Sequence, residues 1–151
     1  MSNVETEKQL QNRVIPFSPA DISELEIAEV AEALRSGWIT TGPRTKELER
    51  RLAEYCHTSK TVCLNSATAA EELNLRICGI GPEDEVVVPA YTYTASASAV
   101  IHCGAKVVFV DSQKDNCEMD YEKVAEAITE KTKAVVAVDL GGIICDYEKL
   151  Y

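Results

Sequence analysis

From residue 60 onward the chain alternates between short apolar runs and segments with helical spacing. The runs TVCLN, EVVVPA, KVVFVD and KAVVAVDL are apolar on both faces, with no polar residue at every second position. Strands of this kind are typical of parallel sheets that helices cover on both sides, whereas antiparallel strands usually expose one polar face. The pattern therefore predicts an α/β fold with a parallel sheet of four strands flanked by helices.

Helical spacing fills the intervals between these runs. Ala70, Leu73 and Ile77 recur at the spacing of one helical face, which is predicted to pack inward. Asp120 is expected to cap a later helix, because an Asp side chain accepts hydrogen bonds from the first helical amides. The intervals predicted to be helical are 67–78, 93–102 and 121–128.

Before residue 60 the sequence predicts a tail and two further helices. Residues 1–14 are polar and are expected to form a flexible tail, whereas residues 15–151 are expected to belong to one domain. Asp21 and Glu24 have the spacing of a capping box, and Pro43 suits the first turn of a second helix. The residues predicted to face inward are Ile27, Val30, Ala31 and Leu34 in the first helix, and Leu48, Leu52 and Tyr55 in the second.

The net charge of −10 over 151 residues argues against two classes of partner. Nucleic-acid binding requires clustered Lys and Arg, and anionic membrane surfaces attract the same positive charge. No apolar run has the length of a membrane span, and the first residues lack the apolar stretch of a signal peptide. The composition predicts a cytoplasmic protein with no nucleic-acid or membrane partner.

The six cysteines do not have the spacing of a zinc site, since no C-x-x-C occurs. Cys56-His57 and His102-Cys103 supply four ligands on paper. Adjacent side chains point in different directions on a helix or a strand, so each pair would chelate poorly. We predict no metal site, and reduced, mostly buried thiols.

The first predicted strand ends at Asn65-Ser66-Ala67-Thr68, directly before a predicted helix. One interpretation is that Ser66 caps the helix, which is a common role of Ser at this position. The other is a phosphate site, because small residues admit a ligand to the unpaired first amides of a helix and the helix dipole favours an anion. The chain contains no G-x-x-x-x-G-K-[ST] motif, and Gly79-Ile80-Gly81 leads from a helix into a strand, the reverse of a dinucleotide fingerprint.

Other candidate residues follow the later strands. In open α/β sheets, ligands bind beyond the carboxyl ends of the strands. Tyr93 stands at such an end and suits either stacking on a planar cofactor or packing in the core, and the residues alone favour the core. Asp111 and Asp139 each follow an apolar strand, where Asp more commonly serves a turn or cap than a ligand. Neither His57 nor His102 is expected to be catalytic.

Several segments in register resemble the DegT/StrS-type family of pyridoxal-phosphate (PLP) dependent sugar aminotransferases, from about residue 15 to residue 151. The resemblance implies a partial fold type I architecture, with residues 15–151 as the incomplete N-terminal part of the PLP-binding large domain. It also implies homodimers that transfer an amino group from glutamate or glutamine to a nucleotide-linked keto sugar. The segments that carry the resemblance are GWITTGPRTKELERRLAEY, LNSATAA, GIGPEDEVVVPAYTYTASASAV, GAKVVFVD, ITEKTKAVVAVDLGG and CDYEKL.

The resemblance implies a role for individual residues. Ser66, Ala67 and Thr68 would bind the PLP phosphate, and Tyr93 would stack on the pyridine ring. The loop that lines the substrate side of the site would be formed by Thr40, Thr41 and Gly42. Glu71 departs from the family, which usually has an apolar residue there, and a carboxylate that faces the core is costly unless it is paired or solvated.

No catalytic residue is assigned within residues 1–151. In the family, the Schiff-base lysine and the acid that keeps the pyridine nitrogen protonated belong to later motifs, and Lys131, Lys133 and Lys149 do not match them. We therefore expect these residues alone not to transaminate and to bind PLP weakly at most. Two alternatives stay open: a stand-alone binding or assembly module, and a relative that dehydrates sugars, with His in place of the lysine.

The strand–helix alternation still runs at Leu140, so the predicted sheet looks unfinished. An unfinished sheet leaves unpaired backbone groups and apolar surface exposed. We expect self-association as a consequence.

Overall fold

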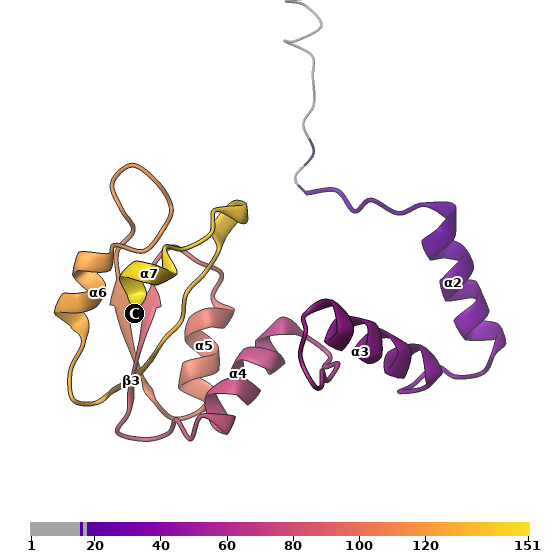
Figure 1. Cartoon of the computed structure of the whole chain (residues 1–151), viewed down its shortest axis with the longest axis horizontal. Coiled ribbons are helices and arrows are strands. Elements are labelled where there is room, and N and C mark those ends of the chain that lie inside the picture. Colours follow the sequence, from indigo (N-terminus) through magenta and orange to yellow (C-terminus); the bar gives the residue numbers. More distant parts are fainter. Residues whose placement is uncertain (1–15, 17) are drawn as a thin grey trace, which may run out of the picture. The chain divides into compact units, whose positions relative to one another are not determined.

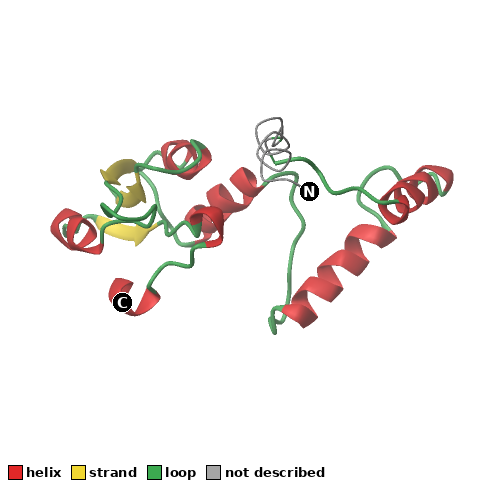
Figure 2. Cartoon of the chain, turned by 90° about the horizontal axis from the view of Figure 1, so that it is seen from above, coloured by secondary structure: helices red, strands yellow, loops and turns green. Residues whose placement is uncertain are grey.

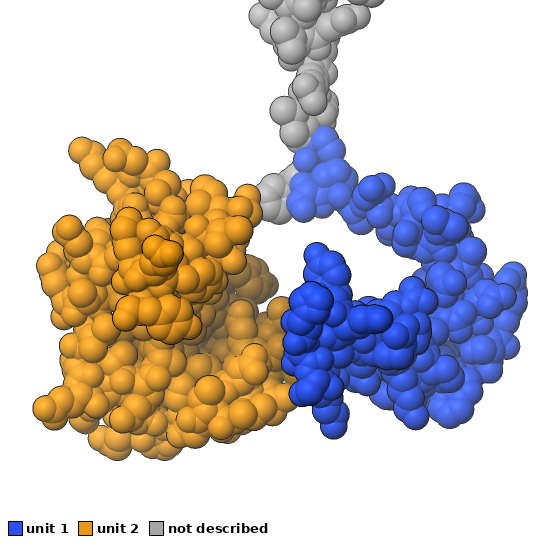
Figure 3. Space-filling model, in the orientation of Figure 1, with its two compact units in different colours: residues 1–63 blue, residues 64–151 orange. Residues whose placement is uncertain are grey.

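The computed structural model describes residue 16 and residues 18–151, so the predicted tail of residues 1–14 lies outside the described residues. The chain separates into two compact units, Met1–Cys63 and Leu64–Tyr151 (Figure 3). Among the described residues, no helix is both long and apolar enough to cross a membrane.

The first unit contains helices α2 (Glu24–Arg35) and α3 (Pro43–Tyr55). Ser23, not Asp21, caps α2: its hydroxyl accepts a hydrogen bond from the Leu25 amide at 3.2 Å, and the Glu26 carboxylate accepts one from the Ser23 amide at 2.6 Å. The predicted capping box was wrong by two residues, because Ser23 and Glu26 provide the same spacing with a shorter capping side chain.

The predicted limits of the two helices are otherwise close to the structure. Gly37 ends α2 with a φ of 75°, a conformation that favours glycine, and Pro43 occupies the first turn of α3 as predicted. The predicted inward faces were wrong, because neither helix contains a buried residue.

The second unit contains a parallel sheet in the order β2-β1-β3. Strand β1 (Glu85–Pro89) pairs with β2 (Lys106–Val110) and with β3 (Thr132–Val135), and Val87 lies opposite both Val108 and Val135. The predicted α/β class and the parallel sense of the sheet are confirmed. The sheet has three strands among the described residues, one fewer than predicted.

The missing strand is the predicted one at residues 61–65, which adopts no regular structure. Its first three residues belong to the first unit and are tied to α3 there: the Cys63 amide donates to the Glu49 carboxylate at 2.9 Å, and the Thr61 hydroxyl donates to the Glu49 carbonyl. Val62 and Leu64 are exposed. An apolar run becomes a strand only when a neighbouring strand pairs with it, and this segment is not among the paired strands of the β2-β1-β3 sheet.

Helices cover both faces of the sheet. Figures 1 and 2 show α6 (Tyr121–Ala127) on one side, and α4 (Ala67–Ile77) and α5 (Ala95–His102) on the other. Val86 and Val88 pack with the α4–α5 layer, whereas Val87 packs on the opposite face with residues of α6 and of the terminal helix α7 (Tyr147–Leu150). All three valines are fully buried, as expected for a strand covered on both sides.

Two helical predictions in this unit need correction. In α4, Leu75 is the buried residue, whereas the predicted inward residues Leu73 and Ile77 are 40% and 72% exposed. Helix α5 begins at Ala95, two residues later than predicted, so Tyr93 precedes the helix. A short 3₁₀ turn (η1, Leu140–Gly142) follows β3.

Candidate cofactor-binding site

The first turn of α4 combines a cap with open donors. Ser66 has extended backbone angles and its hydroxyl accepts a hydrogen bond from the Ala69 amide at 3.1 Å, so the capping interpretation is confirmed. The amides of Ala67 and Thr68 precede the first intrahelical hydrogen bond and find no partner in the helix. Capping by Ser66 therefore leaves two backbone donors for an acceptor from outside the helix.

The position of this turn suits an anion. The turn at 78–84 joins α4 to the start of β1, so α4 runs against the strands and its first turn is directed toward their carboxyl ends (Figure 1). Ser66 and Ala67 are exposed and Thr68 is half-buried. The helix dipole and the open amides favour a phosphate group there.

Tyr93 follows the carboxyl end of β1 and is 79% exposed. It is therefore not the core aromatic that the residues alone favoured. The turn that carries it is held at its base by the Ala90 amide, which donates to the Val110 carbonyl at 2.8 Å, and by a contact of 3.3 Å between the hydroxyls of Thr92 and Ser96. The tyrosine ring is left free to contact a planar ligand.

The two aspartates at strand ends serve local structure. The Asp111 carboxylate accepts a hydrogen bond from the Ser112 amide at 2.8 Å. The Asp139 carboxylate accepts one from the Cys145 amide at 2.9 Å. Burial raises the pKa of the Cys145 thiol, and the nearby Asp139 carboxylate raises it further. These bonds are the turn contacts that the sequence favoured for both residues.

Thr40, Thr41 and Gly42 belong to the other unit, in the loop between α2 and α3. Thr40 and Gly42 line a cavity of about 90 Å³ together with Trp38, whereas Thr41 does not line it. Gly42 is buried and caps α3 with no side chain, while Thr40 and Thr41 are exposed.

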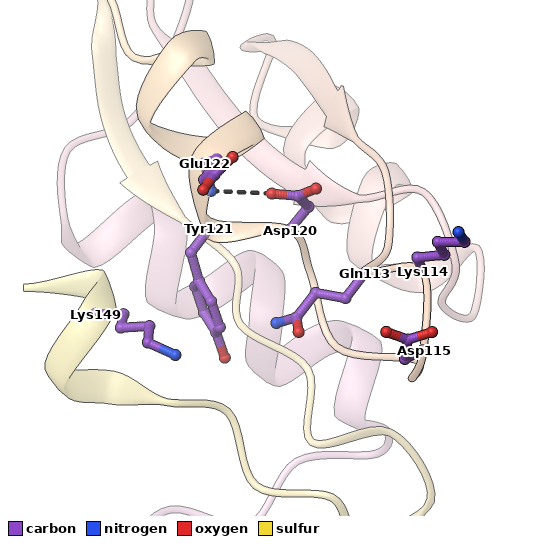
Figure 4. A pocket seen from close by; sticks show the side chains of 7 residues that line it. All are labelled: Gln113, Lys114, Asp115, Asp120, Tyr121, Glu122 and Lys149. Atoms are coloured by element: carbon purple, nitrogen blue, oxygen red, sulfur yellow. Dashed lines mark hydrogen bonds between the residues drawn. The ribbon is translucent and has the colours of Figure 1, made fainter.

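A larger polar cavity of about 390 Å³, which no sequence pattern predicted, lies beside the loop that follows β2 (Figure 4). The Tyr121 hydroxyl donates to the Glu118 carboxylate and accepts from the Asp146 amide, both at 2.6 Å. Burial, and then the bond to Glu118, raise the pKa of Tyr121 to about 12. The Nζ atom of Lys149 lies 5.5 Å from the centre of the Tyr121 ring. These groups are committed to holding α6 and α7 together, so we assign the cavity no function. Its lining residues are Gln113, Lys114, Asp115, Asp120, Tyr121, Glu122 and Lys149.

Glu71 lies in an unfavourable environment, as predicted. One of its carboxylate oxygens is buried without a hydrogen-bond partner in the described structure. The cavity beside it, about 190 Å³, is otherwise mainly apolar, and its apolar lining includes Leu75, Ile80, Ala99, Ala134 and Val136. Among the residues that the structure describes, no group of three His, Cys, Asp or Glu side chains is placed to hold a metal ion.

Comparison with known proteins matches residues 20–151 to the DegT/DnrJ/EryC1/StrS aminotransferase family. Curated relatives include the spore coat polysaccharide biosynthesis protein SpsC of Bacillus subtilis, and the UDP-4-amino-4-deoxy-L-arabinose–oxoglutarate aminotransferase of Shewanella sediminis. Each is 39% identical over 94% of this chain, which corresponds to 36% and 37% of the relative's length.

A solved structure, the putative sugar aminotransferase Spr1654 from Streptococcus pneumoniae, is 65% identical over 90% of this chain, with a TM-score of 0.84. It has been determined in PLP and PMP forms, and this chain covers about a third of its length. The fold expected from the resemblance is thus confirmed as part of a PLP-dependent aminotransferase fold. The chain belongs to the DegT/DnrJ/EryC1/StrS aminotransferase family.

Proposed function

We propose that this chain forms the N-terminal part of a PLP-dependent aminotransferase that acts on a nucleotide-linked keto sugar, with glutamate or glutamine as the amino donor. The matched part of this chain covers only 36% and 37% of the two curated relatives, and one of the two is named as an aminotransferase. The residues that bond to the cofactor and hold its ring nitrogen are expected in the remaining length. A cytoplasmic homodimer completes the proposal.

The observation that carries the proposal is the open first turn of α4. Its free amides on Ala67 and Thr68 and the Thr68 hydroxyl fit a phosphate monoester dianion. PLP, when bound, supplies an electron sink for the transferred amino group. In this scheme the phosphate is bound by Ser66, Ala67 and Thr68, which sets the position of the cofactor relative to the start of α4.

Tyr93 orients the cofactor in the same scheme. Its exposed ring at the end of β1 covers one face of the pyridine and excludes water from that face. Thr40, Thr41 and Gly42 form the loop that receives the sugar.

The proposal is tested by equilibrium dialysis of the chain with PLP and with pyridoxal, which lacks the phosphate. We expect PLP to bind more tightly than pyridoxal, and Thr68→Val to weaken PLP binding about tenfold, since a hydrogen bond to a charged group contributes ~1.5 kcal/mol or more. Ser23→Ala is the matched control, because it removes the cap of α2 and leaves α4 intact. Equal binding of PLP and pyridoxal would refute the phosphate site.

Two alternatives deserve a test of their own. A binding or assembly module is favoured by the absence of buried residues in α2 and α3, and it predicts concentration-dependent dimers with no affinity for PLP. A sugar dehydratase relative would use the same phosphate and ring contacts. To separate these two enzymes, a protein with the full length of its relatives is assayed for amino transfer to the sugar. Amino transfer indicates an aminotransferase, and its absence favours the dehydratase.

A further inference from the structure

The cavity of about 190 Å³ beside Glu71 is lined by residues of α4, α5 and β3 and is separate from the proposed cofactor contacts. Neither Thr68 nor Tyr93 lines it. Glu71 is in its wall, and one oxygen of the Glu71 carboxylate is buried without a hydrogen-bond partner among the described residues. A buried polar atom without a partner is uncommon in native proteins, so this carboxylate calls for a partner group.

The cations on the elements that line the cavity serve other contacts. Arg76 is the basic residue of α4, and its guanidinium contacts the Glu72 carboxylate at 2.8 Å and donates to the His102 carbonyl at 2.8 Å. Lys133 of β3 lines a different cavity. A positive charge beside Glu71 therefore has to come from a bound group.

The wall of the cavity favours an organic ammonium over a metal ion. Mg²⁺ and Ca²⁺ require about six or more oxygen ligands, and Glu71 is the one carboxylate among the described residues that line the cavity. A primary ammonium has three N–H donors, and the side chains of Glu71, Asn74 and Ser96 bring three acceptor groups to the wall. The apolar part of the lining suits an alkyl stem and includes Leu75, Ile80, Ala99, Ala134 and Val136.

The size of the cavity and the charge of the chain both suit a short alkylammonium ion. An apolar cavity of about 150 Å³ is large enough to hold benzene. An n-butylammonium ion has fewer heavy atoms than benzene, so a cavity of about 190 Å³ accommodates it. The net charge of −10 attracts cations to the chain and repels anions.

We propose that this cavity binds the terminal ammonium of an alkyl chain, with the charge against the Glu71 carboxylate and the stem along Leu75 and Val136. A free aliphatic amine and a lysine side chain of a polypeptide both present this group. The buried carboxylate destabilises the unbound chain, and the bound cation offsets that cost because it pairs with the charge. The site goes beyond the proposed aminotransferase function and does not depend on it.

The test is the backbone amide spectrum of the ¹⁵N-labelled chain, titrated with n-butylammonium chloride and, separately, with n-butanol at the same ionic strength. We expect saturable shifts of the Leu75, Ala99 and Ala134 amides with the ammonium ion. Binding of n-butanol should be about tenfold weaker, since hydrogen bonds between charged groups are stronger than neutral ones. Equal binding of the two probes, or no saturable shift at these amides, would overturn the site.

Glu71→Gln provides a second readout, because it keeps the size of the side chain and removes its charge. It should weaken n-butylammonium binding about tenfold and leave n-butanol binding unchanged. Glu54→Gln is the matched control: it removes the same charge from an exposed side chain of α3 that pairs with Arg50, and it should not alter binding. An equal loss of binding in both variants would show general attraction to an acidic surface and would contradict the proposal.

A third probe, Nα-acetyl-lysine amide, separates the two sources of the ammonium group. It carries the same alkyl stem attached to a peptide backbone. If it shifts the same amides as n-butylammonium, the cavity admits a lysine side chain of a polypeptide. If n-butylammonium alone shifts them, the ligand is a free amine.

Discussion

Replacing Glu71 by leucine is expected to stabilise the second unit. The buried carboxylate oxygen of Glu71 has no partner among the described residues, and a buried polar group left unsatisfied costs ~1–3 kcal/mol, and more when charged. Leucine removes this atom and adds apolar surface to a cavity of about 190 Å³ that Leu75 and Val136 already line. We expect Glu71→Leu to raise the free energy of unfolding by about 1–3 kcal/mol.

Two other effects of this substitution are small. Leucine and glutamate have similar helix propensities, so the gain does not come from the helix itself. Glu71 lies beyond the first turn of α4, where the helix dipole has little influence on a charge. Glu71→Gln should gain less than Glu71→Leu, because the amide still places unpartnered polar atoms in the cavity.

The assay is urea unfolding followed by far-UV circular dichroism. Glu54→Leu on α3 is the matched control, since it removes an exposed ion pair with Arg50, and such pairs contribute ~0–1 kcal/mol. A Glu71→Leu variant that is no more stable than the unchanged chain would show that the Glu71 carboxylate costs the fold nothing. A loss of stability that grows with protein concentration would show that a second molecule pairs with this carboxylate.

Three further predictions concern the second unit and the self-association of the chain. Val87→Ala should lower the free energy of unfolding by about 2 kcal/mol in the same urea assay, since it removes two fully buried methyl groups at ~0.8 kcal/mol each and leaves a cavity; an unchanged midpoint would contradict the packing of both sheet faces. The Glu72 carboxylate on α4 forms an ion pair with Arg76 of the same helix and lies 3.1 Å from Nδ1 of His102 on α5. The hydrogen bond to Arg76 lowers the pKa of Glu72 most, and the one to His102 lowers it further. A depressed carboxyl pKa contributes stability above the unfolded pKa that is lost as pH falls through the folded value, so Glu72→Gln should destabilise at pH 7 and have little effect at pH 3, as measured by urea unfolding at both pH values. Light scattering over a wide concentration range should show self-association, because apolar side chains such as Tyr55 and Ile144 are exposed; a monodisperse monomer throughout would contradict this prediction.

The sequence was most informative where local chemistry and burial agree. EVVVP is apolar at every interior position and is a central strand in the structure, buried along its whole length. Asp120 caps α6 through two backbone amides, as its position before an apolar helical face predicted. Ser66 caps α4 through one backbone amide, that of Ala69.

The predictions that failed depend on contacts between distant segments. TVCLN has the composition of a strand, but pairing with another strand decides whether such a run forms one, and no local signal reports that pairing. Helical spacing found the face that carries Leu73 and Ile77 but not the depth of its burial, because Leu75 on the adjoining side points at the sheet. The contact between Trp38 and Gly42 is another case, since nothing in GWITTGP predicts that the ring folds back on the glycine.

The most direct test of the phosphate site is the backbone amide spectrum of the ¹⁵N-labelled chain, titrated with PLP and with inorganic phosphate. We expect the Ala67 and Thr68 amides to shift with both ligands, and residues around Tyr93 to shift with PLP alone. Shifts that leave Ala67 and Thr68 unmoved and fall instead in the loop between Asp111 and Asp120 would contradict the phosphate site at α4.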